Sequence, residues 1–345
     1  MARAKIICTL GPSTRDKKTV MGLVKAGMNV ARLNFSHDTY EEFKHRISLV
    51  REISAKTGKP ITILGDLCGP KIRIGEIDGK SINLKAGDEL TITTCQIVGN
   101  QNVVGTTYPN FVSDVEKGNR VLIDDGKIEL TVTDVKPGEV KTKVVIGGEL
   151  KEHKGMNLPG VAVSAPAISA KDFSDIEFAV KEGIDILALS FVRTPDDVIK
   201  AKKLISNYGS DIPVIAKIEK EEAVHNIEGI VNESFGIMIA RGDLGVEMAS
   251  ERVPLIQKKI IGICNKLGKP VITATQMLES MISNPRPTRA ETSDVANAII
   301  DGSDAVMLSG ETSIGQYPVQ AAETVSRIIR DVEDEIGKVR SYADW

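Results

Sequence analysis

Eight short apolar runs, separated by segments with helical spacing, constrain the fold of this chain more than any other feature. Each run has the length of one buried strand and is short for a globular helix. Near-continuous apolar strands are typical of a parallel sheet covered by helices. Eight strand–helix units predict an α/β fold in which the sheet closes into a (β/α)8 TIM barrel. The predicted strands span residues 5–9, 29–34, 61–66, 186–191, 213–219, 236–241, 270–275 and 305–309.

Capping residues mark the ends of several intervening helices. Thr194 precedes Pro195, which is an N-cap followed by proline at the first helical position. The segment Thr288-Arg-Ala-Glu291 has the spacing of a capping box. Asp38-Thr-Tyr-Glu41 repeats that pattern and is expected to open a helix that stops near Gly58. These signals support the alternation of strands and helices.

The alternation is interrupted once, between residues 68 and 162. Glycine-containing turns such as Asp124-Asp125-Gly126, which we expect to close a hairpin, separate short strand-like runs there. These runs cover residues 81–84, 89–93, 120–123, 127–133 and 139–145. We predict an A domain (1–67 and 163–345) with a small all-β barrel B domain (68–162) inserted after the third strand. Without the insertion the chain has about 250 residues, the usual size of such a barrel. The insertion leaves from the barrel mouth, so it is placed to act as a lid.

Composition argues against several functional classes. A net charge of −3 does not favour a broad surface for nucleic acid or anionic membranes. The chain has no signal-peptide pattern and no apolar run near the ~20 residues that span a bilayer, so we expect a cytoplasmic protein. The four cysteines are scattered, which favours reduced thiols, and the four histidines lack the spacing of zinc ligands.

Most predicted strands end in polar or charged residues, and strand ends of a barrel meet at one mouth. Residues two apart in a strand share a face, so Lys217 is expected beside Glu219, and Arg241 beside Asp243. Two carboxylates are enough to bind Mg2+, which takes further ligands from substrate and water. Arg32 suits phosphate because its guanidinium can donate paired hydrogen bonds. Further polar strand ends are Asn34, Ser36, His37, Asp66, Ser190, Arg193, Thr273, Thr275, Ser309 and Glu311.

Together these residues fit a small anionic substrate bearing phosphate and carboxylate. Lys217 supplies a compact positive charge, and Gly242 lets a ligand approach the backbone. Structural alternatives remain: Lys217 with Glu219, or Arg32 with Asp66, as plain ion pairs. A shared ligand site explains all the polar strand ends at once, which a set of separate ion pairs does not.

At these residues the chain resembles the pyruvate kinase family. The resemblance covers nearly all 345 residues through motifs in a fixed order, and such a series is specific. It implies phosphoryl transfer from phosphoenolpyruvate to ADP, giving pyruvate and ATP, on a barrel A domain with a mobile B domain. The motifs are Lys5-Ile-Ile-Cys-Thr-Leu-Gly-Pro12, Ala31-Arg-Leu-Asn-Phe-Ser-His37, Lys154-Gly-Met-Asn-Leu-Pro-Gly160, Ala216-Lys-Ile-Glu219, Ile237-Met-Ile-Ala-Arg-Gly-Asp-Leu-Gly-Val-Glu247, Ala274-Thr-Gln-Met-Leu-Glu-Ser-Met281, Pro285-Arg-Pro-Thr-Arg-Ala-Glu291 and Met307-Leu-Ser-Gly-Glu-Thr312.

The resemblance also implies roles for individual residues. Arg32 contacts the substrate phosphate, and Lys217 stabilises charge on the transferring phosphoryl group. Glu219 and Asp243 hold Mg2+ or Mn2+. The substrate carboxylate is positioned by Gly242, Asp243 and Thr275, and Thr275 is also near the route for protonating the enolate. The implied nucleotide contacts are Asn34, Ser36, His37, Arg73 and Lys154.

The chain departs from the family after the third strand. The family commonly has Asp-Thr-Lys-Gly-Pro-Glu there, whereas this chain has Asp66-Leu-Cys-Gly-Pro-Lys71. Asn34, Ser36 and Asp66 still match ligands of K+, and Leu67 keeps its carbonyl. We hypothesise that the Lys71 ammonium supplies the charge otherwise brought by K+, as in a potassium-independent branch of the family. The alternative is that Lys71 points to solvent.

The family's C-terminal domain has no counterpart before residue 345. In relatives that domain carries the effector site and part of the tetramer interface. We therefore expect no sugar-phosphate activation through that site, and homo-oligomers only through barrel surfaces. The expected small-molecule partners are phosphoenolpyruvate, pyruvate, ADP and ATP.

Two other functions remain open from the sequence. One is a different Mg2+-dependent barrel enzyme acting on pyruvate enolates, such as an aldolase or mutase, which would need neither the B domain nor Arg73 and Lys154. The other is a catalytically silent sensor of nucleotide or metabolite. Four intact residues argue against it: Lys217, Glu219, Asp243 and Thr275.

Overall fold

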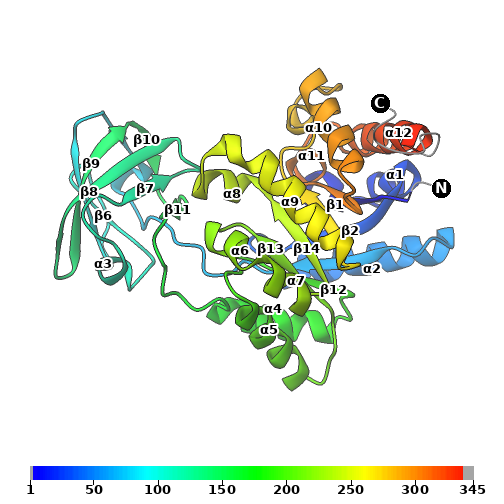
Figure 1. Cartoon of the computed structure of the whole chain (residues 1–345), viewed down its shortest axis with the longest axis horizontal. Helices are drawn as coiled ribbons and strands as arrows, with labels where there is room; N and C mark the ends of the chain where they lie inside the picture. The colour runs from blue at the N-terminus through cyan, green and yellow to red at the C-terminus, as the bar shows by residue number, and fades with distance from the viewer. Residues whose placement is uncertain (1–2, 337–345) are drawn as a thin grey trace. The chain divides into compact units, whose positions relative to one another are not determined.

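The computed structural model describes residues 3–336, so the end of the predicted second barrel segment, 337–345, lies outside the described residues. The chain forms two compact units, which are described separately. The first contains the residues up to Gly69, Ile168–Arg241 and the chain from Pro254 onward. The second contains Pro70–Ala167 and Gly242–Val253. Figure 1 labels many of their elements, which are numbered in chain order.

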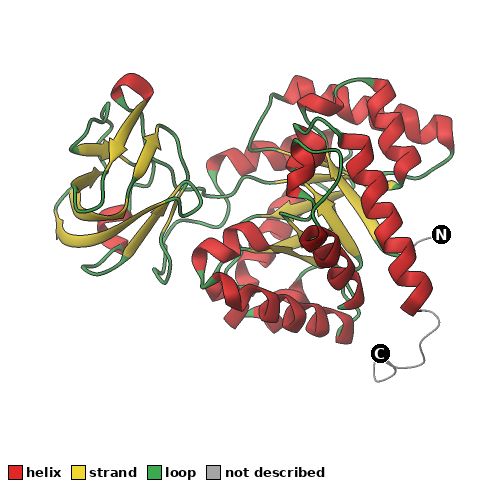
Figure 2. Cartoon of the chain, turned by 90° about the horizontal axis from the view of Figure 1, so that it is seen from above, coloured by secondary structure: helices red, strands yellow, loops and turns green. Residues whose placement is uncertain are grey.

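The first unit is a closed barrel of parallel strands in the order β1-β16-β15-β14-β13-β12-β3-β2. Seven of the eight neighbouring pairs join strands that follow each other among these eight, and pairing of β1 with β16 closes the ring. Figure 2 shows helices surrounding the strands of this unit. The strands are β1 (Lys5–Thr9), β2 (Met28–Asn34), β3 (Thr62–Asp66), β12 (Ile186–Leu189), β13 (Val214–Ile218), β14 (Gly236–Ala240), β15 (Val271–Ala274) and β16 (Ala305–Leu308).

The barrel interior is filled by apolar side chains, in keeping with the packed cores of such barrels. One buried cluster takes members from seven of the eight strands, and Val30 of β2 packs against it. Burial of this cluster away from water is the main favourable term that closes the barrel. Its buried members are Ile7, Leu64, Ala188, Ile215, Met238, Ile272, Ala274, Ala305 and Met307.

Capping explains where the barrel helices begin. Thr194 and Thr288 precede α5 (Pro195–Asn207) and α10 (Arg289–Ile300) as predicted, and Thr288 exchanges hydrogen bonds with Glu291 (2.7 and 3.2 Å). The predicted cap at Asp38 is wrong by one residue. The Thr39 hydroxyl caps the helix instead, because the Asp38 carboxylate accepts a hydrogen bond from Arg46 (2.8 Å).

The helices of the barrel unit are α1 (Lys17–Ala26), α2 (Tyr40–Thr57), α4 (Ala170–Lys181), α5 (Pro195–Asn207), α6 (Glu221–His225), α7 (Ile227–Glu233), α10 (Arg289–Ile300), α11 (Gly310–Ser313) and α12 (Pro318–Ile336). Two more, α8 (Arg241–Glu247) and α9 (Val253–Lys266), cross the division between the units. Short 3-10 turns occur at Pro12–Thr14, Asp78–Lys80, Ser250–Arg252 and Glu279–Ile282. Within residues 3–336, the helices are all too short or too polar to cross a bilayer.

The second unit is built from strands in a six-stranded sheet, β11-β7-β8-β9-β5-β6, and a two-stranded sheet, β10-β4. Both sheets contribute to one apolar core, for example Leu130 from β8 and Leu150 from β10. A single-turn helix, α3 (Phe111–Asp114), lies between β6 and β7 in the chain. The strands are β4 (Ser81–Leu84), β5 (Glu89–Thr93), β6 (Val103–Gly105), β7 (Arg120–Ile123), β8 (Ile128–Lys136), β9 (Glu139–Ile146), β10 (Gly148–Lys151) and β11 (Met156–Asn157).

The predicted fold class is confirmed: a (β/α)8 barrel with an all-β unit inserted after its third strand. The hairpin turn predicted at Asp124-Asp125-Gly126 joins β7 to β8, and all three residues have positive φ. Sequence patterns missed β6, β10 and β11 because these strands are only two to four residues long. Such short strands hold too few apolar residues to show alternation.

Candidate active site

Arg32 and Asp66 form a buried ion pair on the neighbouring strands β2 and β3. Arg32 Nε donates to Asp66 Oδ2 (2.7 Å), and Arg32 Nη1 donates to the Thr9 hydroxyl (2.8 Å). From the sequence, this ion pair is the structural alternative to a ligand contact by Arg32. It does not occupy the whole guanidinium, because Nη2 has no hydrogen-bond partner within residues 3–336. Arg32 therefore keeps a donor for a ligand while Asp66 and Thr9 fix its orientation.

Lys217 lies at the centre of a cluster at the end of β13. Its ammonium is 2.9 Å from Glu219 Oε1 and 3.1 Å from Asp66 Oδ1, and it donates to the Ser190 hydroxyl at 2.7 Å. Lys217 and Glu219 lie on one side of the strand, as their spacing predicts. An ammonium has three donors, so this one meets a ligand only by exchanging one of these partners.

The charges in this cluster stabilise one another in their ionised forms. Burial alone would raise the pKa of Asp66, which is 1% exposed, but Lys217 and Arg32 outweigh burial and hold that pKa below its usual value. Burial alone would lower the pKa of Lys217, but Asp66 and Glu219 raise it well above its ordinary value. The contact of Lys217 with Asp66 Oδ1 is purely ionic, since that oxygen accepts no well-directed hydrogen bond within residues 3–336.

The segment after β12 contacts this cluster directly. The Ser190 hydroxyl donates to the Leu67 carbonyl (2.7 Å), and the Phe191 backbone N–H donates to Glu219 Oε2 (2.7 Å). From the sequence, Ser190 is expected at the mouth but has no assigned role. Phe191 carried no signal, because its contribution comes from the backbone.

The last residue of β2 and the loop that follows carry three of the predicted ligand residues. Asn34 Oδ1 accepts from the Ser36 N–H (3.2 Å), and the His37 N–H donates to the Asn34 carbonyl (3.3 Å). Lys171 on α4 donates to the Phe35 carbonyl of the same loop (2.7 Å). The loop is thus held by its own turn and by a lysine from a different helix.

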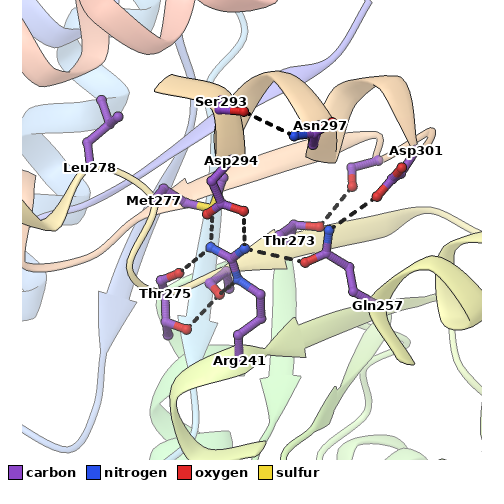
Figure 3. A network of polar contacts seen from close by, with 12 residues as sticks. Arg241, Gln257, Thr273, Thr275, Met277, Leu278, Ser293, Asp294, Asn297 and Asp301 are labelled. Carbon is purple, nitrogen blue, oxygen red and sulfur yellow. Dashed lines mark hydrogen bonds and ion pairs between the residues drawn. The ribbon is translucent and has the colours of Figure 1, made fainter. Parts of the chain in front are cut away.

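Arg241 does not join the Lys217 cluster. The strand-based expectation that Arg241 and Asp243 share a face is wrong, because β14 ends at Ala240 and helix α8 begins at Arg241. Figure 3 shows the guanidinium bound to Asp294 (2.7 Å) and to the Thr275 carbonyl (2.7 Å). Thr275 has a positive φ of 67°. Arg241 therefore supports the backbone at Thr275, one of the predicted substrate residues.

The second unit holds the remaining predicted residues. Lys71 Nζ lies 3.8 Å from Asp243 Oδ1 in this unit, so Lys71 has an acidic partner there. Arg73 Nη1 donates to the His153 carbonyl (3.0 Å), and Lys154 pairs with Asp124 (2.8 Å). Gly242 also belongs to this unit, as the first residue of its segment Gly242–Val253. Because Asp243 and Glu219 belong to different units, their shared role as metal ligands stays a prediction.

The donor chemistry of the two predicted metal ligands fits a hard divalent cation. Both are carboxylates, and Glu219 is buried. In the described part of the chain, nowhere do three His, Cys, Asp or Glu side chains gather as a ready metal site. Mg2+ commonly takes only one or two protein carboxylates and completes its shell with substrate and water, whereas structural zinc requires a full protein set.

Comparisons with known proteins all indicate the same family. The family described as "Pyruvate kinase, barrel domain" matches residues 1–322. A pyruvate kinase of Bacillus licheniformis is 49% identical over 97% of this chain, and one of Geobacillus stearothermophilus is 50% identical over 97%. This chain spans 58% and 57% of the length of those relatives. A pyruvate kinase of Mycobacterium intracellulare is 51% identical over 96% of this chain, which covers 70% of that relative.

Proposed function

This chain belongs to the pyruvate kinase family, and from that premise we propose that it transfers the phosphoryl group of phosphoenolpyruvate to ADP, giving pyruvate and ATP. The observation that supports this most is the buried cluster of Arg32, Asp66, Lys217 and Glu219 at the barrel mouth. Phosphoryl transfer needs little covalent help from the protein and depends on positioning and charge stabilisation. The cluster would supply both positioning and charge stabilisation.

Arg32 and Lys217 are the proposed cations for the transferring phosphoryl group. Arg32 would bind a phosphate oxygen through its remaining donor, Nη2, without losing Asp66. Lys217 would turn one N–H from its present partners toward the charge that develops on the phosphoryl oxygens. Both residues are pre-oriented by buried partners, which reduces reorganisation during the reaction.

We propose that Glu219 and Asp243 hold Mg2+ or Mn2+, which would screen the charges of the approaching phosphates. Gly242, Asp243 and Thr275 would position the substrate carboxylate, with Thr275 also near the route by which the enolate gains its proton. Arg241 would keep the Thr275 backbone in place for this task.

The proposed nucleotide contacts come from both units. In the barrel unit these are Asn34, Ser36 and His37, and in the second unit they are Arg73 and Lys154. Lys154 is already paired with Asp124, so a nucleotide phosphate would compete with that carboxylate. The proposal also includes two domains: an A domain of residues 1–67 and 163–345, and a lid-forming B domain of residues 68–162. A place in glycolysis implies a cytoplasmic enzyme, and outer barrel surfaces are the candidates for self-association.

We further propose that K+ is not required for turnover. The family ligands Asn34, Ser36, Asp66 and Leu67 are present, but Lys71 replaces a carboxylate and would bring a fixed positive charge. Turnover measured in Na+ or Tris salts, with and without K+, tests this point. A large rise on adding K+ would contradict it and would assign those four residues to a working monovalent cation site.

One assay separates the proposed function from its alternatives. Pyruvate formation from phosphoenolpyruvate is measured with Mg2+, with and without ADP, and ATP is quantified in parallel. We expect ADP-dependent formation of both products in equal amounts. Cleavage or rearrangement of an enolate substrate without ADP would favour an aldolase or mutase, and binding without turnover would favour a sensor.

The variant Lys217→Met tests whether the activity depends on the cluster. It should lower kcat by at least about a hundredfold, because a preorganised charge at the reacting group is lost. Lys200→Met is the matched control, since Lys200 pairs with Asp196 on the exposed face of α5 and touches none of the site residues. Equal activity in both variants would remove Lys217 from the mechanism.

A further inference from the structure

The dipeptide Ser190–Phe191 contacts Lys217 and Glu219. In the proposed function, the first stabilises the phosphoryl group and the second holds the metal. Through its side chain, Ser190 accepts a hydrogen bond from the Lys217 ammonium (2.7 Å). Through its backbone, Phe191 donates to Glu219 Oε2 (2.7 Å). Two adjacent residues after β12 therefore hold the proposed phosphoryl-stabilising lysine and a proposed metal ligand.

Ser190 differs in kind from the other partners of Lys217. Asp66 and Glu219 attract the ammonium by charge, which is strong but only weakly directional. The Ser190 hydroxyl is neutral, and its own proton is committed to the Leu67 carbonyl (2.7 Å), so its lone pair faces Lys217 in a fixed direction.

The backbone around this dipeptide is shaped for these contacts. Phe191 has a φ of 53°, a left-handed conformation that a side chain disfavours and that surrounding contacts must stabilise. Gly69 packs against the dipeptide from the loop after β3. A Cβ at Gly69 would lie 2.9 Å from Phe191 Cδ2 and 3.0 Å from Ser190 Cβ, so only glycine permits this approach. Strained residues held by their surroundings are typical of functional sites.

We propose that Ser190 and Phe191 are positioning residues: by accepting one N–H, the Ser190 hydroxyl fixes the orientation of the Lys217 ammonium and so the direction of the N–H that turns to the phosphoryl group, and the Phe191 N–H fixes the Glu219 carboxylate. This inference rests on the proposed phosphoryl transfer. In the absence of the hydroxyl, the ammonium settles between Asp66 and Glu219, and its third donor is no longer directed. The chemical step then slows, while binding of substrate through other residues persists.

Ser190→Ala tests the proposal by steady-state kinetics. Loss of one hydrogen bond to a charged group should lower kcat by roughly ten- to a hundredfold, with KM for phosphoenolpyruvate changed less than about threefold. The matched control is Ser303→Ala, because Ser303 is a buried barrel serine bonded to Thr273 (2.8 Å) and lies outside the cluster. A kcat within about twofold of the wild type, a rise in KM that accounts for the whole loss, or an equal loss in Ser303→Ala would overturn the proposal. Should Ser190→Ala not fold, Ser190→Cys carries the same prediction, since sulfur is a weak acceptor.

A second readout does not depend on activity. Reductive methylation followed by peptide mass spectrometry measures how readily Lys217 reacts. We expect Lys217 to be labelled several-fold faster in Ser190→Ala than in the wild type, with unchanged labelling of the exposed Lys200. Equal Lys217 labelling would refute the positioning role. If the wild type makes no pyruvate, the proposed function fails, and this labelling experiment still decides whether Ser190 holds Lys217.

Discussion

Replacing Arg241 with methionine should weaken both the barrel and its predicted substrate loop. The guanidinium binds Asp294 (2.7 Å), the Thr275 carbonyl (2.7 Å) and, at longer range, the Ala274 carbonyl (3.3 Å). Methionine keeps much of the apolar stem and removes all the donors. The variant therefore isolates the polar contacts that Figure 3 displays.

The magnitude follows from the partners that Arg241 leaves behind. Breaking a buried ion pair costs about 3–5 kcal/mol, but the Asp294 side chain is 35% exposed and water can hydrate it, so its share is well below that range. Each carbonyl that loses its donor adds about 1 kcal/mol or more. We expect a total near 3 kcal/mol. At roughly 2–4 °C per kcal/mol for a domain of this size, Tm should fall by about 6–12 °C.

The same change should also act on catalysis. Thr275 and Gln276 both have positive φ, so their loop is strained and depends on outside support. We expect kcat/KM for phosphoenolpyruvate to fall at least about tenfold when the Thr275 carbonyl loses its donor. Lys200→Met is the control, because Lys200 pairs with Asp196 on the exposed face of α5, outside this network. Thermal unfolding within about 2 °C of the wild type, together with unchanged kcat/KM, would refute the reasoning.

Three further predictions follow from individual contacts. Lys71→Glu should make turnover rise several-fold on adding K+; an equal response in wild type and variant would exclude Lys71 as the substitute charge. Burial opposes the ionised form of Glu291, but hydrogen bonds from Ser280 outweigh it and lower the Glu291 pKa. The stability that Glu291 contributes is therefore present above its unfolded pKa and is lost as pH falls through its folded pKa. Glu291→Gln should cost about 1 kcal/mol at pH 7 and less near pH 3, measured by urea unfolding at both pH values, and a pH-independent difference would contradict this. Gly69→Ala should cost about 1–2 kcal/mol in urea unfolding through positive φ and the contact with Phe191, and a neutral effect would show that the loop adapts.

The barrel could be predicted from the sequence because each of its strands is a short continuous segment with its own apolar run. Strand β1 agrees with its predicted bounds, Lys5–Thr9, and the other seven differ by at most two residues at an end. The contact between Lys217 and Glu219 was equally accessible, since two residues on one strand need only the period of two. Local periodicity thus carries both the fold and this part of the site.

Contacts between distant segments could not be derived in the same way. The prediction for Arg241 failed because strand and helix meet between residues 240 and 241, and a shift of one residue there changes the face on which a side chain lies. The contact of Phe191 with Glu219 uses a backbone N–H, which any residue other than proline provides, so residue identity holds no signal for it. Positive φ at a phenylalanine is likewise set by packing and not by local preference.

The charge balance of the cluster explains why the proposed reaction needs cations beyond those of the barrel. Arg32 and Lys217 bring two positive charges, and Asp66 and Glu219 bring two negative ones, so the cluster as folded has no net charge. This neutrality stabilises buried ions, since each has an opposite partner within about 3 Å in the same cluster. It also means that a substrate with phosphate and carboxylate groups would enter with its charge uncompensated. Positive charge that arrives with the ligands would offset the charge of such a substrate, which agrees with the proposal of a divalent ion on the carboxylates.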